Sequence, residues 1–103
     1  MAKPVMTGDW RGEINGLRYR LEVLQIASHV SGLLHVGGFK KTGNIGGVNY
    51  YPVVVLSGSF LRQGAHFEGR FVDDNTITGT LKFQLDRVTV TFHRDLAAKP
   101  AKP

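Results

Sequence analysis

The sequence predicts an all-β domain in which an antiparallel up-and-down meander closes into a small barrel of seven or eight strands. Apolar and polar residues alternate along most of the chain, and no helical periodicity is present. Short turn signals separate the alternating runs, which is typical of strands that pair in chain order. An apolar–x–Gly–x–apolar motif occurs five times, centred on Gly12, Gly32, Gly58, Gly69 and Gly79.

The alternation defines seven strand-like runs: 9–14, 17–26, 29–36, 50–62, 65–72, 76–85 and 87–94. Asn15-Gly16 is a strong signal for a two-residue hairpin turn. We expect further turns at Gln63-Gly64, at Asp73-Asp74-Asn75 and at Asp86-Arg87.

The segment 37–49 holds five of the thirteen glycines, and we expect it to be a long loop. An eighth strand then requires that the run 17–26 or the run 50–62 bend and count twice.

The motif glycines fall on the apolar face of their strands, so they should point into the barrel. Their first interpretation, which we favour, is that they permit the strong coiling that closes a small sheet. The second is that they line a cavity. The predicted inner face comprises Trp10, Ile14, Leu34, Leu56, Phe60, Phe67, Phe71, Ile77, Leu81, Phe83, Val88, Val90 and Phe92.

Four apolar residues have the outward parity: Leu33, Val53, Val55 and Leu61. If the runs 29–36 and 50–62 are neighbours, these residues form a patch that predicts a homo-oligomer interface. The alternative is a β-bulge in the run 50–62, which would bury Val53 and Val55 instead.

At 103 residues the chain is long enough to bury one core, so we expect a single domain over 8–95. A flexible N-terminus over 1–7 and a disordered basic tail over 96–103 would flank it. The sequence has no cysteine and no apolar stretch that resembles a signal peptide or a membrane span. We therefore expect a cytoplasmic protein without a membrane span.

A formal net charge of +5 raises the expectation of an anionic partner. The basic residues are dispersed, so a nucleic-acid partner is not favoured over ordinary solvation. The candidates for anion binding are Arg18, Arg20, Lys40 and Lys41.

Catalytic and metal-binding patterns are not found in the sequence. The eight acidic residues fall on outward positions, in turns or at strand ends, and the four histidines lack a close metal-binding spacing. Ser57 and Ser59 have no base nearby in sequence. We therefore predict no catalytic residue, no metal ligand and no cofactor, although residues distant in sequence could still converge in an enzyme.

Gly8-Asp9-Trp10 near the start and Arg94 on the last strand resemble the signature of the calycin superfamily, which includes lipocalins, fatty-acid-binding proteins and avidin-like barrels. The resemblance implies a meander barrel in which the arginine packs over the tryptophan as a cation–π pair. Avidin-like barrels surround biotin with several tryptophans, and this chain has only Trp10, so biotin binding is not expected.

The leading interpretation is a non-enzymatic binding barrel, oligomeric, that holds a small apolar or amphipathic molecule. Its cavity and mouth would be formed by Trp10, Phe39, Phe60, Phe67, Phe71 and Arg94. One alternative is a structural or protein-interaction module with a packed core. Another is a polyanion-binding or nucleic-acid-binding protein that uses its basic surface and tail.

Overall fold

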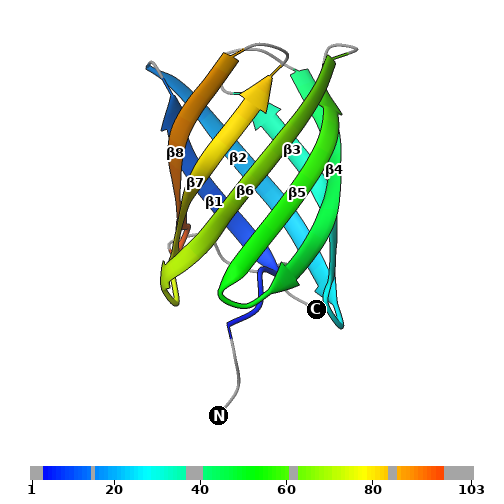
Figure 1. The fold of residues 1–103 in the computed structure, drawn as a ribbon, viewed down its shortest axis with the longest axis vertical. Coiled ribbons are helices and arrows are strands. Elements are labelled where there is room, and N and C mark those ends of the chain that lie inside the picture. Colours follow the sequence, from blue (N-terminus) through cyan, green and yellow to red (C-terminus); the bar gives the residue numbers. More distant parts are fainter. Residues whose placement is uncertain (1–3, 15, 37–40, 61–62, 84–85, 97–103) are drawn as a thin grey trace.

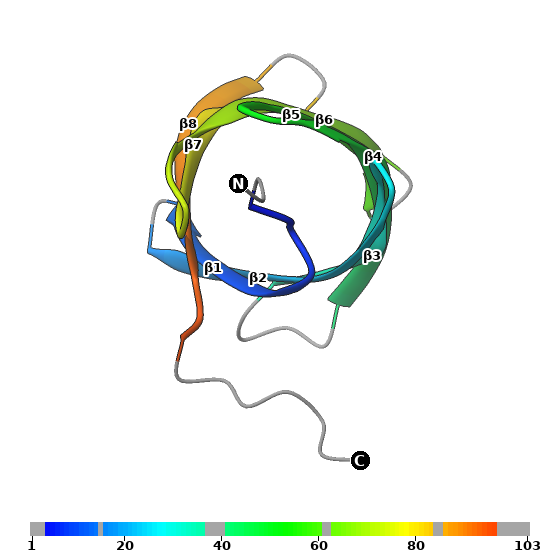
Figure 2. The ribbon, with the colours of Figure 1, turned by 90° about the horizontal axis from the view of Figure 1, so that it is seen from below.

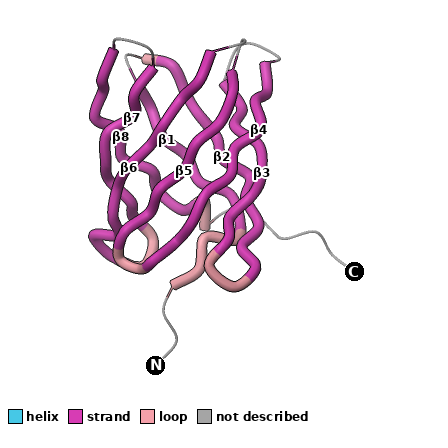
Figure 3. Tube along the Cα trace, turned by 45° about the vertical axis from the view of Figure 1, so that its right-hand side comes forward, coloured by secondary structure: helices cyan, strands magenta, loops and turns pink. Residues whose placement is uncertain are grey.

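The computed structural model describes residues 4–14, 16–36, 41–60, 63–83 and 86–96. Eight strands make up nearly all of this chain, as Figure 3 shows. Their bounds are β1 Gly8–Ile14, β2 Leu17–Ile26, β3 His29–Val36, β4 Lys41–Tyr50, β5 Val53–Phe60, β6 Gln63–Asp73, β7 Thr76–Phe83 and β8 Asp86–Arg94.

The strands form a closed barrel in chain order, and every neighbouring pair is antiparallel (Figure 1). This confirms the predicted all-β meander and fixes the number of strands at eight. The closing contact between β1 and β8 is the shortest, with register partners only from Trp10–Arg94 to Gly12–Phe92.

The predicted loop over 37–49 is wrong for most of its length, because its residues from Lys41 onward form β4. The eighth strand therefore comes from the glycine-rich segment, and neither long run bends to supply it. Gly47 shows why glycine is needed here: a Cβ built on it would lie 1.9 Å from the carbonyl oxygen of Val55 on β5. The glycines that suggested a loop allow close pairing of β4 with its neighbours.

Two predicted turns are displaced. Gln63 and Gly64 pair with Phe60 and Ser59 and belong to β6, while Asp86 and Arg87 pair with β7 and belong to β8. The run 50–62 is also interrupted by a turn at Tyr51-Pro52 between β4 and β5. At the two displaced turns the strand pairing extends further than the local turn propensity predicts, while Tyr51-Pro52 forms a turn that the sequence analysis did not predict.

The core confirms most of the predicted inner face. Its members with described side chains are all buried except Val88, which is partly buried against the core. The side chains of Phe60 and Phe83 lie outside the described residues. The sequence prediction omitted five buried apolar residues: Met6, Leu21, Val23, Val30 and Val54.

The motif glycines approach the backbone of neighbouring strands closely, as the curvature interpretation requires. A Cβ at Gly32 would lie 1.9 Å from the carbonyl oxygen of Glu22, and a Cβ at Gly79 would lie 2.2 Å from that of Glu68. Real Cβ atoms are not found at such distances, so the sheet could not coil as tightly with any larger residue at these positions.

The N-terminal segment before β1 crosses the lower end of the barrel (Figure 2), where Arg94 at the end of β8 contacts it. The Trp10 indole N–H donates to the carbonyl oxygen of Met6 at 2.8 Å, and both side chains are buried. The guanidinium of Arg94 lies 4.3 Å from the centre of the Trp10 ring and donates to the carbonyl oxygens of Val5 and Thr7. Burial lowers the pKa of Arg94, and the charge of Asp74 opposes that shift; an arginine nevertheless stays charged in proteins.

Burial along β5 alternates as predicted: Val53 is 44% exposed, Val54 is fully buried and Val55 is partly exposed. The bulge that would bury Val53 and Val55 is therefore wrong. Leu33 is not beside them, because β4 lies between β3 and β5 and Leu33 pairs with Asn44. Leu61 lies outside the described residues.

Other exposed apolar residues lie on the outer surface in two places: Tyr50 and Val53 on β4 and β5, where Val48 also pairs with Val55, and Leu24 and Ile26 on β2, which Ser31 and His29 of β3 separate from β4. We call these two places together the apolar wall and define it by Leu24, Ile26, Val48, Tyr50, Val53 and Val55.

Candidate anion-binding groove

A groove opens on the outside of the barrel where the pairing of β1 with β8 ends. Their pairing stops at Gly12 and Phe92, although β1 continues to Ile14 and β8 extends back to Asp86. The groove has a volume of about 870 Å³. Its lining comes from β1, β2, β3 and β8: Arg11, Gly12, Glu13, Arg18, Tyr19, Arg20, His35, Thr89, Thr91 and His93.

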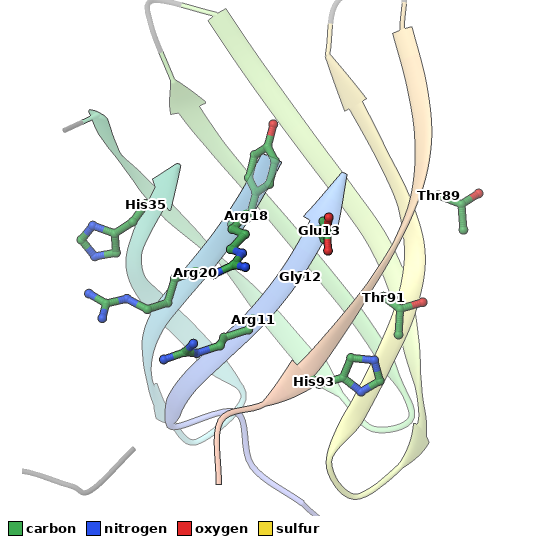
Figure 4. Close-up of a pocket in the computed structure, with 10 residues that line it drawn as sticks. Arg11, Gly12, Glu13, Arg18, Arg20, His35, Thr89, Thr91 and His93 are labelled. Atoms are coloured by element: carbon green, nitrogen blue, oxygen red, sulfur yellow. The ribbon is translucent and has the colours of Figure 1, made fainter. Parts of the chain in front are cut away.

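Cationic side chains dominate the charged lining of the groove. Figure 4 shows Arg11, Arg18 and Arg20 between His35 on one side and the residues of β8 on the other. Glu13 is the single carboxylate among the lining residues.

The arrangement follows from strand register. Arg11 on β1 pairs with Arg20 on β2 and with His93 on β8, while Arg20 pairs with His35 on β3. Paired residues of an antiparallel sheet project from the same face with their Cβ atoms about 4.5–5.5 Å apart. The ladder therefore sets four nitrogen-bearing side chains in one row across the outer wall.

Two of the arginines form ion pairs with carboxylates at the edge of the groove. The Arg11 Nε donates to Asp95 Oδ2 at 2.6 Å, and Arg20 donates to Glu22 Oε1. The same Glu22 oxygen lies 3.2 Å from His35 Nε2. These contacts orient the side chains of Arg11 and Arg20. An incoming anion would have to share the two arginines with the carboxylates or displace the carboxylates.

Arg18 differs from the other two arginines. It is exposed, and no ion pair with it is found among residues 4–14, 16–36, 41–60, 63–83 and 86–96. Its register partner is Glu13, and no hydrogen bond or ion pair joins the two side chains in the described part of the chain. The Arg18 guanidinium is therefore the most available donor group of the groove.

Only two of the four predicted anion-binding residues can be placed in the structure. Arg18 and Arg20 come together in the groove, while Lys40 and the side chain of Lys41 lie outside the described residues. The sequence prediction missed Arg11, His35 and His93. The Asn15-Gly16 hairpin contained a signal for the first of these, because a two-residue turn pairs Ile14 with Leu17 and hence Arg11 with Arg20.

Three of the predicted cavity residues belong to the packed core, and Arg94 lies over the Trp10 ring. Trp10, Phe67 and Phe71 are buried, and the rings of Trp10 and Phe71 meet edge to face with centroids 6.0 Å apart. Phe39 and the side chain of Phe60 lie outside the described residues. The interior cavity bounded by Tyr19, Leu34, Leu56, Phe67 and other apolar residues has a volume of about 30 Å³, which corresponds to about one water molecule in the liquid.

Within the described ranges, no group of three or more histidine or acidic residues is placed to hold a metal ion. No helix of the described chain is long and apolar enough to cross a membrane. Comparison with known proteins finds no family model, no curated protein and no solved structure that matches the chain.

Proposed function

We propose that the chain is a calycin-like binding barrel that holds a small amphipathic anion in the groove. The observation that carries this proposal is that Arg11, Arg18 and Arg20 line one hollow of about 870 Å³. Small-molecule sites commonly have volumes of about 300–1,000 Å³. The groove would act by binding, since its residues offer charge and hydrogen-bond donors without a nucleophile–base pair.

The arginines favour a compact oxyanion as the head group of the ligand. A guanidinium presents its N–H donors in a planar fork that matches a carboxylate, sulfate or phosphate. Arg18 would bind the head group directly because no carboxylate of the described residues occupies it. Arg11 and Arg20 are ion-paired with Asp95 and Glu22, so they would contribute the N–H donors that these carboxylates leave free.

Tyr19 supports an apolar part of the ligand. It lines the groove, borders the small interior cavity and packs partly buried against the core. A hydrocarbon or aromatic group attached to the anion would pack against this ring and against the methyl groups of Thr89 and Thr91.

The charge pattern favours a small anion over a polyanion. Glu13 lines the groove, and Glu22 and Asp95 stand at its rim, so carboxylates interrupt the basic row where a long phosphate backbone would have to pass. A nucleic acid remains the runner-up partner and forms one outcome of the test below.

The calycin resemblance is supported by the closed eight-stranded meander and by Arg94 packed over Trp10. In this proposal the ligand does not enter through the lower end of the barrel, where Arg94 covers Trp10. It binds to the side wall of the barrel. The site would then lie at the β1–β8 seam, outside the packed interior.

Isothermal titration with octyl sulfate, kept below its micelle concentration, tests the proposal. We expect saturable binding that Arg18→Glu abolishes and that Arg70→Glu leaves intact. Arg70 is an exposed arginine of β6 and makes a charge-matched control. Equal loss in both variants would indicate a general charge effect, and preferential binding of a single-stranded oligonucleotide would favour the polyanion alternative.

Self-association through the apolar wall is a second candidate function. Ile26 is 67% exposed and Tyr50 63%, and Val53 lies opposite Tyr50 in the register. Such residues at the surface of a barrel favour burial against another protein surface, and a two-fold dimer would be the simplest closed arrangement.

A further inference from the structure

Three polar side chains form a hydrogen-bonded chain on the outer wall of β5 and β6, away from the groove. Ser57 and His66 are direct register partners, and Ser57 Oγ lies 2.9 Å from His66 Nδ1. His66 Nε2 lies 3.0 Å from Glu68 Oε1. We propose that Ser57 is a nucleophile that accepts the acyl group of small activated carboxylic esters, with His66 as its base and Glu68 as the positioning residue.

The hydrogen-bond order fixes the direction of proton movement. The Glu68 carboxylate can only accept a hydrogen bond, so His66 presents Nε2–H to it. The neutral imidazole then has its lone pair on Nδ1, which faces the Ser57 hydroxyl. Ser57 Oγ–H donates to this nitrogen, and that is the arrangement in which a histidine can take the proton of an attacking serine.

The sheet ladder holds the three groups in place. Ser57 and His66 sit on adjacent paired strands, and Glu68 lies two residues after His66, on the same face of β6. Their spacing is therefore set by the backbone register and does not depend on a mobile loop.

The wall beside Ser57 is open to a substrate. On its other side Ser57 pairs with Gly46 of β4, which has no side chain. A Cβ built on Gly46 would meet only the carbonyl oxygen of Val30, at 3.4 Å. Ser57 itself is exposed. An acyl group could thus approach Oγ over Gly46 while His66 stays on the opposite side.

The proposed step is an acyl transfer in two parts. As Ser57 Oγ attacks the ester carbon, its proton passes to His66 Nδ1; the bond to the leaving alcohol then breaks, and His66 returns the proton to that alcohol. Water, with His66 again as base, attacks the acyl-serine, releases the carboxylic acid and restores the serine hydroxyl. No electron donor or acceptor is required.

The substrate class follows from the position of the site on a sheet. Backbone amides around Ser57 are used in the ladders of β4, β5 and β6, so a pair of free amides to stabilise an oxyanion is not expected there. Esters with a good leaving group depend least on such stabilisation. We therefore infer reaction with small activated esters and not with amides.

Pre-steady-state hydrolysis of p-nitrophenyl acetate by the full chain tests the proposal. We expect a burst of nitrophenolate and one acetyl group on the peptide that contains Ser57, identified by mass spectrometry. Ser57→Ala should remove both, while Ser31→Ala, which changes the exposed serine on the far side of Gly46, should keep them. Exposed histidines also hydrolyse this ester directly, so the acetyl group on Ser57, and not the rate alone, decides the outcome. Acetylation confined to lysine or histidine would overturn the proposal.

The positioning of His66 by Glu68 requires a separate measurement. Glu68→Gln should slow acylation by roughly tenfold, a modest share of the 10²–10⁴-fold that a positioned base contributes. In ¹⁵N NMR spectra of the imidazole, wild type should show the Nε2–H tautomer of His66, and the variant should show a mixture. An unchanged tautomer together with an unchanged rate would contradict the positioning role, and circular dichroism would verify that each variant is folded.

Discussion

The guanidinium of Arg94, the last residue of β8, lies 4.3 Å from the ring centre of Trp10 near the start of β1. The same side chain donates to the carbonyl oxygens of Val5 and Thr7, and so joins both ends of the chain beneath the barrel. The contact lies within the short paired part of the β1–β8 seam. Below this point the segment before β1 lies across the end of the barrel, and above it the seam opens into the groove.

Replacing Arg94 by Ala should lower the free energy of unfolding by about 2–4 kcal/mol, because the cation–π contact and several hydrogen bonds of a charged donor are lost together. Urea denaturation measures the change. Arg87→Ala, which removes an exposed arginine from the same strand, should stay within about 0.5 kcal/mol of wild type. Equal effects of the two substitutions would show that Arg94 does not close the barrel.

Gly79→Ala should destabilise the barrel by roughly 2 kcal/mol or more, because the new methyl group would collide with the backbone of β6. Gly64→Ala is the matched control, since a Cβ there meets nothing within 4 Å. Thermal denaturation of both variants makes the comparison. A fully stable Gly79→Ala protein would contradict the curvature role of the inward glycines.

Phe71→Ala should cost about 3–5 kcal/mol, the usual range for a buried phenylalanine. Phe71 is buried and its ring contacts those of Trp10 and Tyr51. The next residue, Val72, is 59% exposed, so Val72→Ala should change stability by less than about 0.5 kcal/mol. Chemical denaturation that reversed this order would mean that the two residues exchange faces.

Period-two alternation was enough to predict the barrel and most of its core. Val54 and Val53 could be assigned to opposite faces in principle, because side-chain direction alternates without exception along an unbulged strand. Met6 could not be predicted in this way. It precedes the first strand and becomes buried only because the N-terminal segment folds back under Trp10.

The glycine-rich strand shows where local propensity misleads. Glycine disfavours a strand when each residue is considered alone. In β4 that cost is outweighed by close approach to β3 and β5, which depends on tertiary pairing that a single segment does not reveal. Ser57 and His66 illustrate the same limit, since nine residues of sequence separate a pair that the hairpin brings to 2.9 Å.

Self-association through the apolar wall predicts a dimer at micromolar concentration. Substituting Asp for both Ile26 and Val53 should dissociate it, because unpaired charges would be buried in the contact, while circular dichroism remains that of the folded barrel. Analytical ultracentrifugation separates the outcomes. A monomeric wild type would contradict the interface.

The central claim is that the β1–β8 seam binds a small amphipathic anion, and an amide NMR titration with octyl sulfate tests it most directly. We expect saturable shifts that begin at Arg11, Arg18, Tyr19 and Thr91, with little change at Tyr50 and Val53 of the apolar wall. The claim would be contradicted by saturable shifts centred on Phe67 and Leu81 of the interior, by shifts confined to the apolar wall, or by the absence of saturation.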